Sequence, residues 1–248
     1  LVFDTGSKSP YGFDMGEMVV APWLHSQQIQ QIDSLMVSHG DNDHRGGADY
    51  LLAKFQVAQV ATSQLKNFPM PINSNLTLCT AGQVWIWDEV KFEVLSPDSK
   101  LAYSKTNNQA CVLKVSNAQH ALLLPSDIEK ATEQGLINMG AALQADVVLM
   151  PHHGSKTSSS AQFLQAVAPK LALVSTGYLN RFNHPHPRVL ERYQVLGVDL
   201  LNTAEVGAIY VDFPNLSQEE MIIFSYRNQY ARFWRRTVEP SVTAILDK

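Results

Sequence analysis

The chain has 248 residues, of which 45% are hydrophobic and 17% are charged, and its formal net charge is −4. This composition is that of a folded protein with a sizeable core, and it excludes a disordered chain. The acidic balance argues against the strongly basic surface of a duplex-DNA reader, and no run of about 18 apolar residues is present that could span a membrane.

Apolar segments rich in Val, Ile and Leu alternate with helical patterns along the chain. Strands are expected at residues 1–6, 34–39, 57–62, 90–97, 110–116, 121–127, 146–153, 171–177 and 208–213. Helices are expected at residues 48–55, 128–143, 160–168 and 187–197, and an accessory strand with a tail at residues 216–240. No linker or internal repeat divides the chain. The alternation predicts one α/β domain in which helices cover a sheet.

The two cysteines, Cys79 and Cys111, lie far apart in the sequence and form no C-x-x-C pair. Their spacing favours two buried thiols, and a single disulfide is the alternative. The chain opens on the apolar segment LVFDTG without an initiator Met. We therefore expect the sequence to be an excised part of a longer protein.

Polar, ionisable residues follow the expected strands at the point where each strand ends. Asp4 follows LVF, His39 follows LMVS, Asp127 follows LLLPS, and His152 and His153 follow VVLMP. In layered α/β folds, side chains at strand ends converge on one edge of the sheet, where ligands bind. We expect these residues to meet in one place.

The segment SHGDNDHRGG contains two histidines and two aspartates within six positions. Imidazole nitrogens and carboxylate oxygens are the usual ligands of divalent metals, so this loop is a candidate metal site. Two ions would need a shared ligand, for which the Asp127 carboxylate is suited, and His153 could complete the second set. The alternative is a solvated polar loop that caps a helix. The four loop candidates are His39, Asp41, Asp43 and His44.

HGDNDH followed by GG resembles the His-x-His-x-Asp-His motif of the metallo-β-lactamase superfamily. FDTG, SDIE and PHHGS resemble its leading Asp motif and its downstream Asp and His motifs. In detail, the chain resembles the C-terminal domain of ComEC-type competence proteins. The segments that carry this resemblance are DTG, VVAPWLHSQQIQQIDSLMVSHGDNDHRGG, NNQACVLKV, LLLPSDIE, LMPHHGSKTSSS and NRFNHPHPRV, in that order.

The resemblance covers residues 1–235 and leaves residues 236–248 as a C-terminal tail. It implies a four-layer αβ/βα sandwich with a metal site at one edge, and one or more strands ahead of residue 1. It also implies two divalent ions, zinc or manganese. The implied metal ligands are His39 and Asp41 for the first ion, Asp43, His44 and His153 for the second, Asp127 as the bridge, and His152 as an alternative to His153.

Three positions depart from the superfamily pattern. Asp41 stands for the second His of the motif, Asn107-Asn108-Gln109 replaces a Gly-His-Thr motif, and Ser126 replaces the Gly before the bridging Asp. The missing histidine predicts a weaker first metal site. A carboxylate-rich ligand set also favours manganese over zinc.

The expected catalytic residues are Asp43, His184 and Asn108. His184, in NHPHP, could contact a phosphate or protonate a leaving group, and the alternative is a surface turn without a function. Asn108 could donate a hydrogen bond to a phosphate, although asparagine is common in turns. Asp4 is expected to orient the metal loop or one of its ligands, and a purely turn-forming Asp is the alternative.

Two metal ions held close together suit the hydrolysis of a phosphodiester, whose transition state spreads negative charge. The resemblance implies a nuclease domain that degrades the DNA strand that is not imported during natural transformation. It also implies single-stranded DNA and the membrane channel of the same parent protein as partners, and a location on the periplasmic side of the inner membrane. The alternatives are a hydrolase of a small ester (a lactonase or phosphorylcholine esterase) and a metal-poor module that guides DNA without catalysis.

Overall fold

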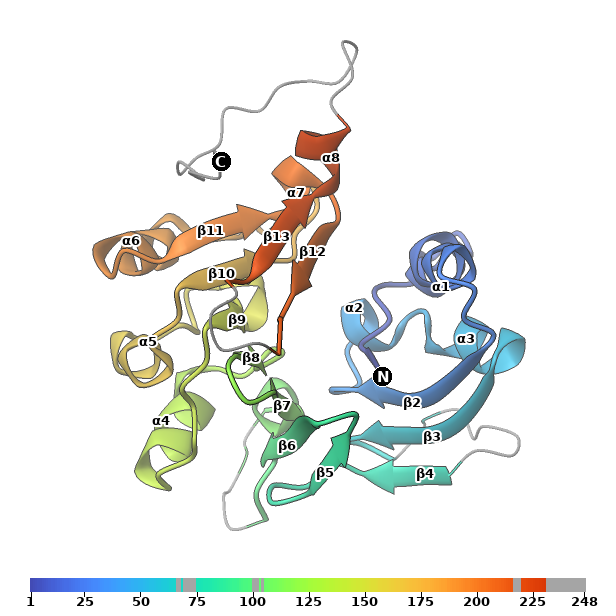
Figure 1. The fold of residues 1–248 in the computed structure, drawn as a ribbon, viewed down its shortest axis with the longest axis horizontal. Coiled ribbons are helices and arrows are strands. Elements are labelled where there is room, and N and C mark those ends of the chain that lie inside the picture. Colours follow the sequence, from blue (N-terminus) through green and yellow to red (C-terminus); the bar gives the residue numbers. More distant parts are fainter. Residues whose placement is uncertain (66–67, 69–74, 100–102, 104, 216–219, 231–248) are drawn as a thin grey trace. The chain divides into compact units, whose positions relative to one another are not determined.

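The computed structural model describes residues 1–65, 68, 75–99, 103, 105–215 and 220–230 (Figure 1). The chain forms two compact units. The first comprises Leu1–Gln83 and Val94–Val112, and the second comprises Val84–Glu93 and Leu113–Lys248. Within the described part of the chain, every helix is too short or too polar to cross a lipid bilayer.

The first unit contains a parallel sheet whose strand order is β1-β2-β3-β4 (Figure 1). The strands are β1 (Val2–Phe3), β2 (Gln31–Val37), β3 (Gln56–Thr62) and β4 (Asn75–Leu78). The helices are η1 (Gly16–Val20), α1 (Ala21–Ser26), α2 (Asn42–Arg45), α3 (Ala48–Lys54) and η2 (Asn107–Gln109). The end of β2 is buried on both faces, as expected for a parallel strand. Its core residues Leu35 and Val37 pack in one cluster with Leu51 of α3.

A disulfide joins Cys79 and Cys111 in the first unit, with the two Cα atoms 6.1 Å apart. The preference for two buried thiols was therefore wrong. Two adjacent strands bring the cysteines together, because the last residue of β2 pairs with Thr62 at the end of β3. The backbone N–H of Cys79 donates to the carbonyl oxygen of Thr62 at 3.0 Å, and that of Cys111 donates to the carbonyl oxygen of Ser38 at 2.9 Å.

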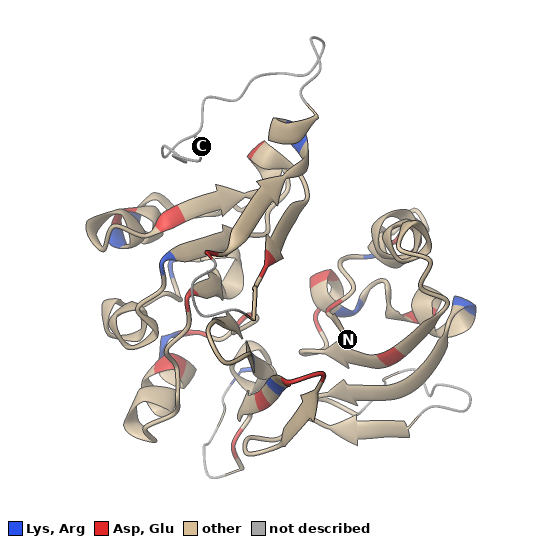
Figure 2. Ribbon diagram, in the orientation of Figure 1, with Lys and Arg blue, Asp and Glu red and all other residues tan. Residues whose placement is uncertain are grey.

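A mixed sheet has the order β11-β10-β9-β8-β7-β6-β5, and it belongs to the second unit except for residues 94–96 of β6 and Val112 of β7. Strands β8 to β11 are parallel, whereas β7 pairs with β8 and β5 with β6 in the antiparallel sense. Strands β8, β9 and β10 carry no charged residue, as Figure 2 shows. The strands are β5 (Val84–Trp87), β6 (Val90–Ser96), β7 (Val112–Ser116), β8 (Ala121–Leu124), β9 (Val147–Leu149), β10 (Leu171–Val174) and β11 (Asp199–Asn202).

Helices and a hairpin complete the second unit. The helices are α4 (Lys130–Asn138), η3 (Pro151–Gly154), α5 (Ala161–Val167), α6 (Pro187–Val195), α7 (Thr203–Val206) and α8 (Tyr226–Gln229). The hairpin consists of β12 (Ile209–Asp212) and β13 (Ile222–Ser225), which pair antiparallel. Apolar residues of β9, β10, β11 and α7 form a buried cluster against which the hairpin packs.

The α/β fold class predicted from the sequence is confirmed. Every segment expected to form a strand overlaps one, the four expected helices are α3, α4, α5 and α6, and the accessory strand is β13. Strands β4, β5 and β11 and the helical segment η1–α1 were missed. The division into one domain, residues 1–235, with a tail stays a prediction, and the tail lies outside the described residues.

Candidate metal centre

His39 lies two residues beyond β2, and its side chain is fully buried. Its Nδ1 atom is 3.1 Å from Ser38 Oγ, and its Nε2 atom is 3.5 Å from Asp41 Oδ2. Asp41 is the N-cap residue of α2, and 46% of its side chain is exposed. The polar loop therefore presents an imidazole from its buried side and a carboxylate from its solvent side.

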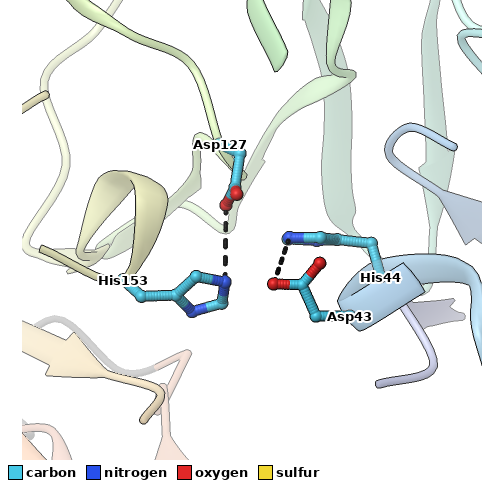
Figure 3. Close-up of side chains that lie close together, drawn as sticks. All are labelled: Asp43, His44, Asp127 and His153. Carbon is cyan, nitrogen blue, oxygen red and sulfur yellow. Dashed lines mark ion pairs between the residues drawn. The ribbon is translucent and has the colours of Figure 1, made fainter. Parts of the chain in front are cut away.

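Asp43 and His44 follow on α2, as Figure 3 shows. Asp43 Oδ2 lies 4.0 Å from His44 Nε2; the Asp43 side chain is half exposed, and that of His44 is buried. The His44 ring also lies beside the His39 ring, with the centroids 4.3 Å apart. Two imidazoles and two carboxylates of one short segment thus gather within the first unit.

Asp4 holds this arrangement from the end of β1. Its carboxylate accepts hydrogen bonds from the Ser38 backbone N–H at 2.7 Å and from the Ser38 hydroxyl at 2.9 Å. The same carboxylate lies 2.7 Å from His44 Nδ1. Since a carboxylate only accepts hydrogen bonds, His44 carries its proton on Nδ1. The free lone pair is then on Nε2, the ring nitrogen nearer to Asp43. This contact fits the role of orienting a ligand that the sequence suggested for Asp4.

The second unit contains Asp127, His152 and His153. Asp127 is 4% exposed and follows β8 by three residues. Its Oδ1 lies 3.6 Å from His153 Nε2, the pair drawn in Figure 3, and its Oδ2 lies 3.6 Å from His152 Nε2. His153 Nδ1 donates to the carbonyl oxygen of Ser175 at 2.8 Å, and His152 Nδ1 lies 3.3 Å from Thr157 Oγ1.

The backbone around these residues adopts a left-handed conformation that L side chains rarely take. The φ angle is 51° at Ser126, 50° at His152 and 53° at His153. Such angles cost about 1 kcal/mol or more per residue and are retained where the surrounding structure requires them. The angle at Ser126 gives a physical reason for the glycine that the superfamily pattern has at this position, because glycine adopts positive φ without strain.

The expected catalytic residues lie in different units. The His184 ring is 6.2 Å from the His152 ring in the second unit. Burial, followed by the neighbouring His152 and His153, lowers the pKa of His184, so its imidazole is neutral near pH 7. Asn108 lies in η2 of the first unit and is 4% exposed. The segment that contains it is joined to the metal loop by the hydrogen bond from Cys111 to Ser38.

Sequence reasoning missed the residues that position the candidate ligands. These are Ser38, which lies between Asp4 and the two histidines, and Ser175, whose carbonyl oxygen accepts from His153. A serine directly before His39 is a weak signal, and a backbone carbonyl gives no sequence signal at all.

The donor set fits a divalent metal. Each unit places a histidine Nε2 beside a carboxylate, and in both cases the other ring nitrogen is hydrogen-bonded, to a carboxylate at His44 and to a backbone carbonyl at His153. Metal-binding histidines are held in this way in known sites, because the second hydrogen bond fixes the tautomer and the ring orientation. Nitrogen and oxygen donors of this kind bind zinc and manganese.

Comparison with known proteins places these residues in context. The sequence profile of the metallo-beta-lactamase superfamily matches residues 1–178. Recombination protein 2 of Haemophilus influenzae is 33% identical over 238 residues, which is 96% of this chain and 29% of that protein. ComE operon protein 3 of Bacillus subtilis is 32% identical over 87% of this chain and 30% of its own length. Competence protein ComA of Neisseria gonorrhoeae is 34% identical over 84% of this chain and 28% of its own length. The chain spans under a third of each relative.

Proposed function

The chain belongs to the metallo-β-lactamase superfamily and is related to ComEC-type competence proteins, and from this premise we propose that it is a metal-dependent nuclease domain. Its substrate is DNA, most directly the strand that is not imported during DNA uptake. The observation that carries the proposal is the pairing of an oriented imidazole with a carboxylate in each unit, at His44 and Asp43 and at His153 and Asp127.

The superfamily motif carries the ligand assignment that we propose for this chain. His39 and Asp41 would hold a first ion and Asp43, His44 and His153 a second, with Asp127 as the shared carboxylate. His153 is preferred to His152 because its Nδ1 donates to a backbone carbonyl, which leaves Nε2 as the electron-pair donor. Two divalent ions, zinc or manganese, would supply the Lewis acidity that polarises a phosphoryl oxygen and lowers the pKa of water.

The remaining residues act on the substrate. His184 is neutral near pH 7, since burial lowers its pKa, and this suits it to hydrogen-bond to a phosphate rather than to serve as a standing acid. The Asn108 amide is proposed to donate to a phosphate oxygen. Asp43, half exposed on α2, is proposed both as a ligand and as the carboxylate nearest the attacking water.

We place the domain on the periplasmic side of the inner membrane, joined to the membrane channel of its parent protein. The relative named as a competence protein and the Cys79–Cys111 disulfide support this location. Disulfides persist in oxidising compartments, of which the bacterial periplasm is one, and are rare in the cytosol.

Metal removal tests the proposal. The purified chain, stripped with a chelator, is expected to leave labelled single-stranded DNA intact and to regain cleavage when manganese or zinc is added back. Product length on denaturing gels and metal content by elemental analysis are measured together. Less than about a tenth of an equivalent of metal after reconstitution would contradict a metal enzyme. Hydrolysis of a lactone or phosphorylcholine ester, without cleavage of DNA, would replace the nuclease by a small-ester hydrolase.

Asp4→Asn tests the orientation of His44. The amide keeps the shape of the carboxylate but removes the charge that holds the Nδ1 proton, so metal affinity is expected to fall by about 10-fold to 100-fold. Competition with a coloured zinc chelator measures this affinity. Asp14→Asn is the matched control, because Asp14 is also a buried aspartate of the first unit and accepts a hydrogen bond from the Glu17 backbone N–H. Equal affinities for the two variants would contradict the orienting role.

A further inference from the structure

The loop between β10 and α6 exposes large side chains beside the candidate metal ligands of the second unit. Tyr178 is 53% exposed, Leu179 84% and Phe182 61%, and Arg181 is exposed with them. We call these four residues the 178–182 platform. Clustered apolar side chains at a protein surface mark an interaction site more often than isolated ones do.

The loop is fixed by its own hydrogen bonds, chiefly through Asn180. The Asn180 amide nitrogen donates to the carbonyl oxygens of His184 at 2.6 Å and Gly177 at 3.2 Å, and its Oδ1 accepts from the His184 backbone N–H at 2.9 Å. The Asn183 N–H donates to the carbonyl oxygen of Asn180 at 3.0 Å. The platform is therefore held in place before any ligand binds, which lowers the entropic cost of binding.

The platform is also joined to the candidate ligands. The Phe182 ring stacks on the His184 ring, with centroids 5.7 Å apart and planes inclined by 26°, and His184 in turn lies beside His152. Gly154, which follows the two histidines, has no room for a side chain, because a Cβ atom there would lie 2.5 Å from Pro185 Cβ. A ligand on the platform would thus lie next to Asp127, His152 and His153, all within the second unit.

The chemistry of the platform fits one class of ligand. The Arg181 guanidinium lies over the Phe182 ring, 4.7 Å from its centroid, and Tyr178 adds a second exposed aromatic ring. Aromatic rings stack on unpaired bases while arginine contacts the backbone phosphates, which is how proteins bind single-stranded nucleic acid. In a duplex the faces of the bases are already stacked on one another, so the platform cannot stack on them and adds little binding energy for duplex DNA.

Resting on the proposed nuclease function, we propose that the 178–182 platform binds an unpaired base of a single-stranded DNA substrate and makes the domain prefer single strands to duplex. Phe182 is the stacking residue and Arg181 contacts the adjoining phosphate. Both residues position the substrate and take no part in the chemical step.

The test is the steady-state kinetics of Phe182→Ala. On a labelled oligothymidylate, KM is expected to rise by about 10-fold to 100-fold, the range of one lost base–aromatic stack, with kcat unchanged. Phe182→Tyr should restore the wild-type KM. The KM for duplex DNA and for an abasic oligonucleotide of the same length, which has no base to stack, should be the same in Phe182→Ala as in the wild type. Tyr210→Ala is the matched control, because Tyr210 is an aromatic residue of the same unit, 49% exposed on β12. Its KM should not change.

Binding of the same oligonucleotide in the presence of a chelator, measured by fluorescence anisotropy, separates the platform from catalysis. Weaker binding by Phe182→Ala without any cleavage by the wild type would uphold the platform and overturn the nuclease proposal. An unchanged KM, an equal loss on duplex, or an equal loss on the abasic oligonucleotide would overturn the platform. Oligouridylate is the RNA arm, and binding of oligouridylate alone would overturn the assignment to DNA.

Discussion

Asp127→Asn is expected to lower the metal-dependent cleavage of DNA by about a thousandfold or more. The Asp127 side chain is buried, and its two oxygens each lie 3.6 Å from a histidine Nε2. The amide has nearly the same shape, so the fold is expected to survive. It removes the negative charge that we assign to both metal ions, and one of its oxygens becomes an NH2 group that cannot act as a ligand.

Single-turnover cleavage of labelled single-stranded DNA, with metal content measured on the same samples, checks this expectation. Asp146→Asn is the matched control, because Asp146 is a partly buried carboxylate of the second unit whose nearest partners are Lys170, at 2.9 Å, and the Ala121 backbone N–H, also at 2.9 Å. It should retain the wild-type rate. Equal activity of Asp127→Asn and the wild type would place the hydrolytic centre elsewhere in the chain.

Glu133→Ala is expected to lower the free energy of unfolding by about 3 to 5 kcal/mol. Glu133 lies on α4 and is fully buried, and its two carboxylate oxygens accept from the backbone N–H groups of Ser159 at 2.5 Å and Ser160 at 2.8 Å. Ser160 in turn caps α5 by accepting from the Phe163 N–H. Alanine leaves the buried Ser159 N–H and the partly buried Ser160 N–H without acceptors, and it opens a cavity near Tyr193, which is also fully buried.

Urea denaturation followed by circular dichroism measures the loss. Gln134→Ala is the control on the same helix, since Gln134 is exposed and bonds only to Asn138 in the described structure. Its unfolding free energy should stay within about 0.5 kcal/mol of the wild-type value. A midpoint for Glu133→Ala equal to that of the control would show that the buried carboxylate does not hold α4 to the start of α5.

The same carboxylate gives a pH dependence with a defined sign. Burial raises the pKa of Glu133, and its hydrogen bonds to Ser160 and Ser159 oppose this only in part. A raised pKa in the folded state means that the native protein favours the protonated form. The stability gained is fully present below the unfolded pKa and is lost as the pH rises through the folded pKa. The unfolding free energy of the wild type relative to Glu133→Gln should therefore fall as the pH rises above the unfolded pKa of glutamate, about 4.3.

The sequence predicted the chemistry of the candidate ligands because their residue types and local spacing carry it. Two histidines and two aspartates in HGDNDH, and polar residues directly after apolar strands, are visible without any tertiary information. The alternation of strands and helices was also predicted from the sequence, since the periodicity of apolar residues that distinguishes them is set by residues only a few positions apart. The helical segment η1–α1 was not predicted, because its exposed residues Met18, Val19 and Trp23 are apolar. The segment therefore lacks the polar face expected of a surface helix.

Contacts between residues far apart in the chain were decided by tertiary structure alone. The bond from Asp4 to His44 spans 40 positions and the one from His153 to Ser175 spans 22, and both depend on which strands lie side by side. The Cys79–Cys111 disulfide follows from the register of β2 and β3, which no property of the two cysteines encodes. Local sequence fixes which donors are available, whereas strand order and register fix which of them meet, because these arise from burial summed over the whole sheet.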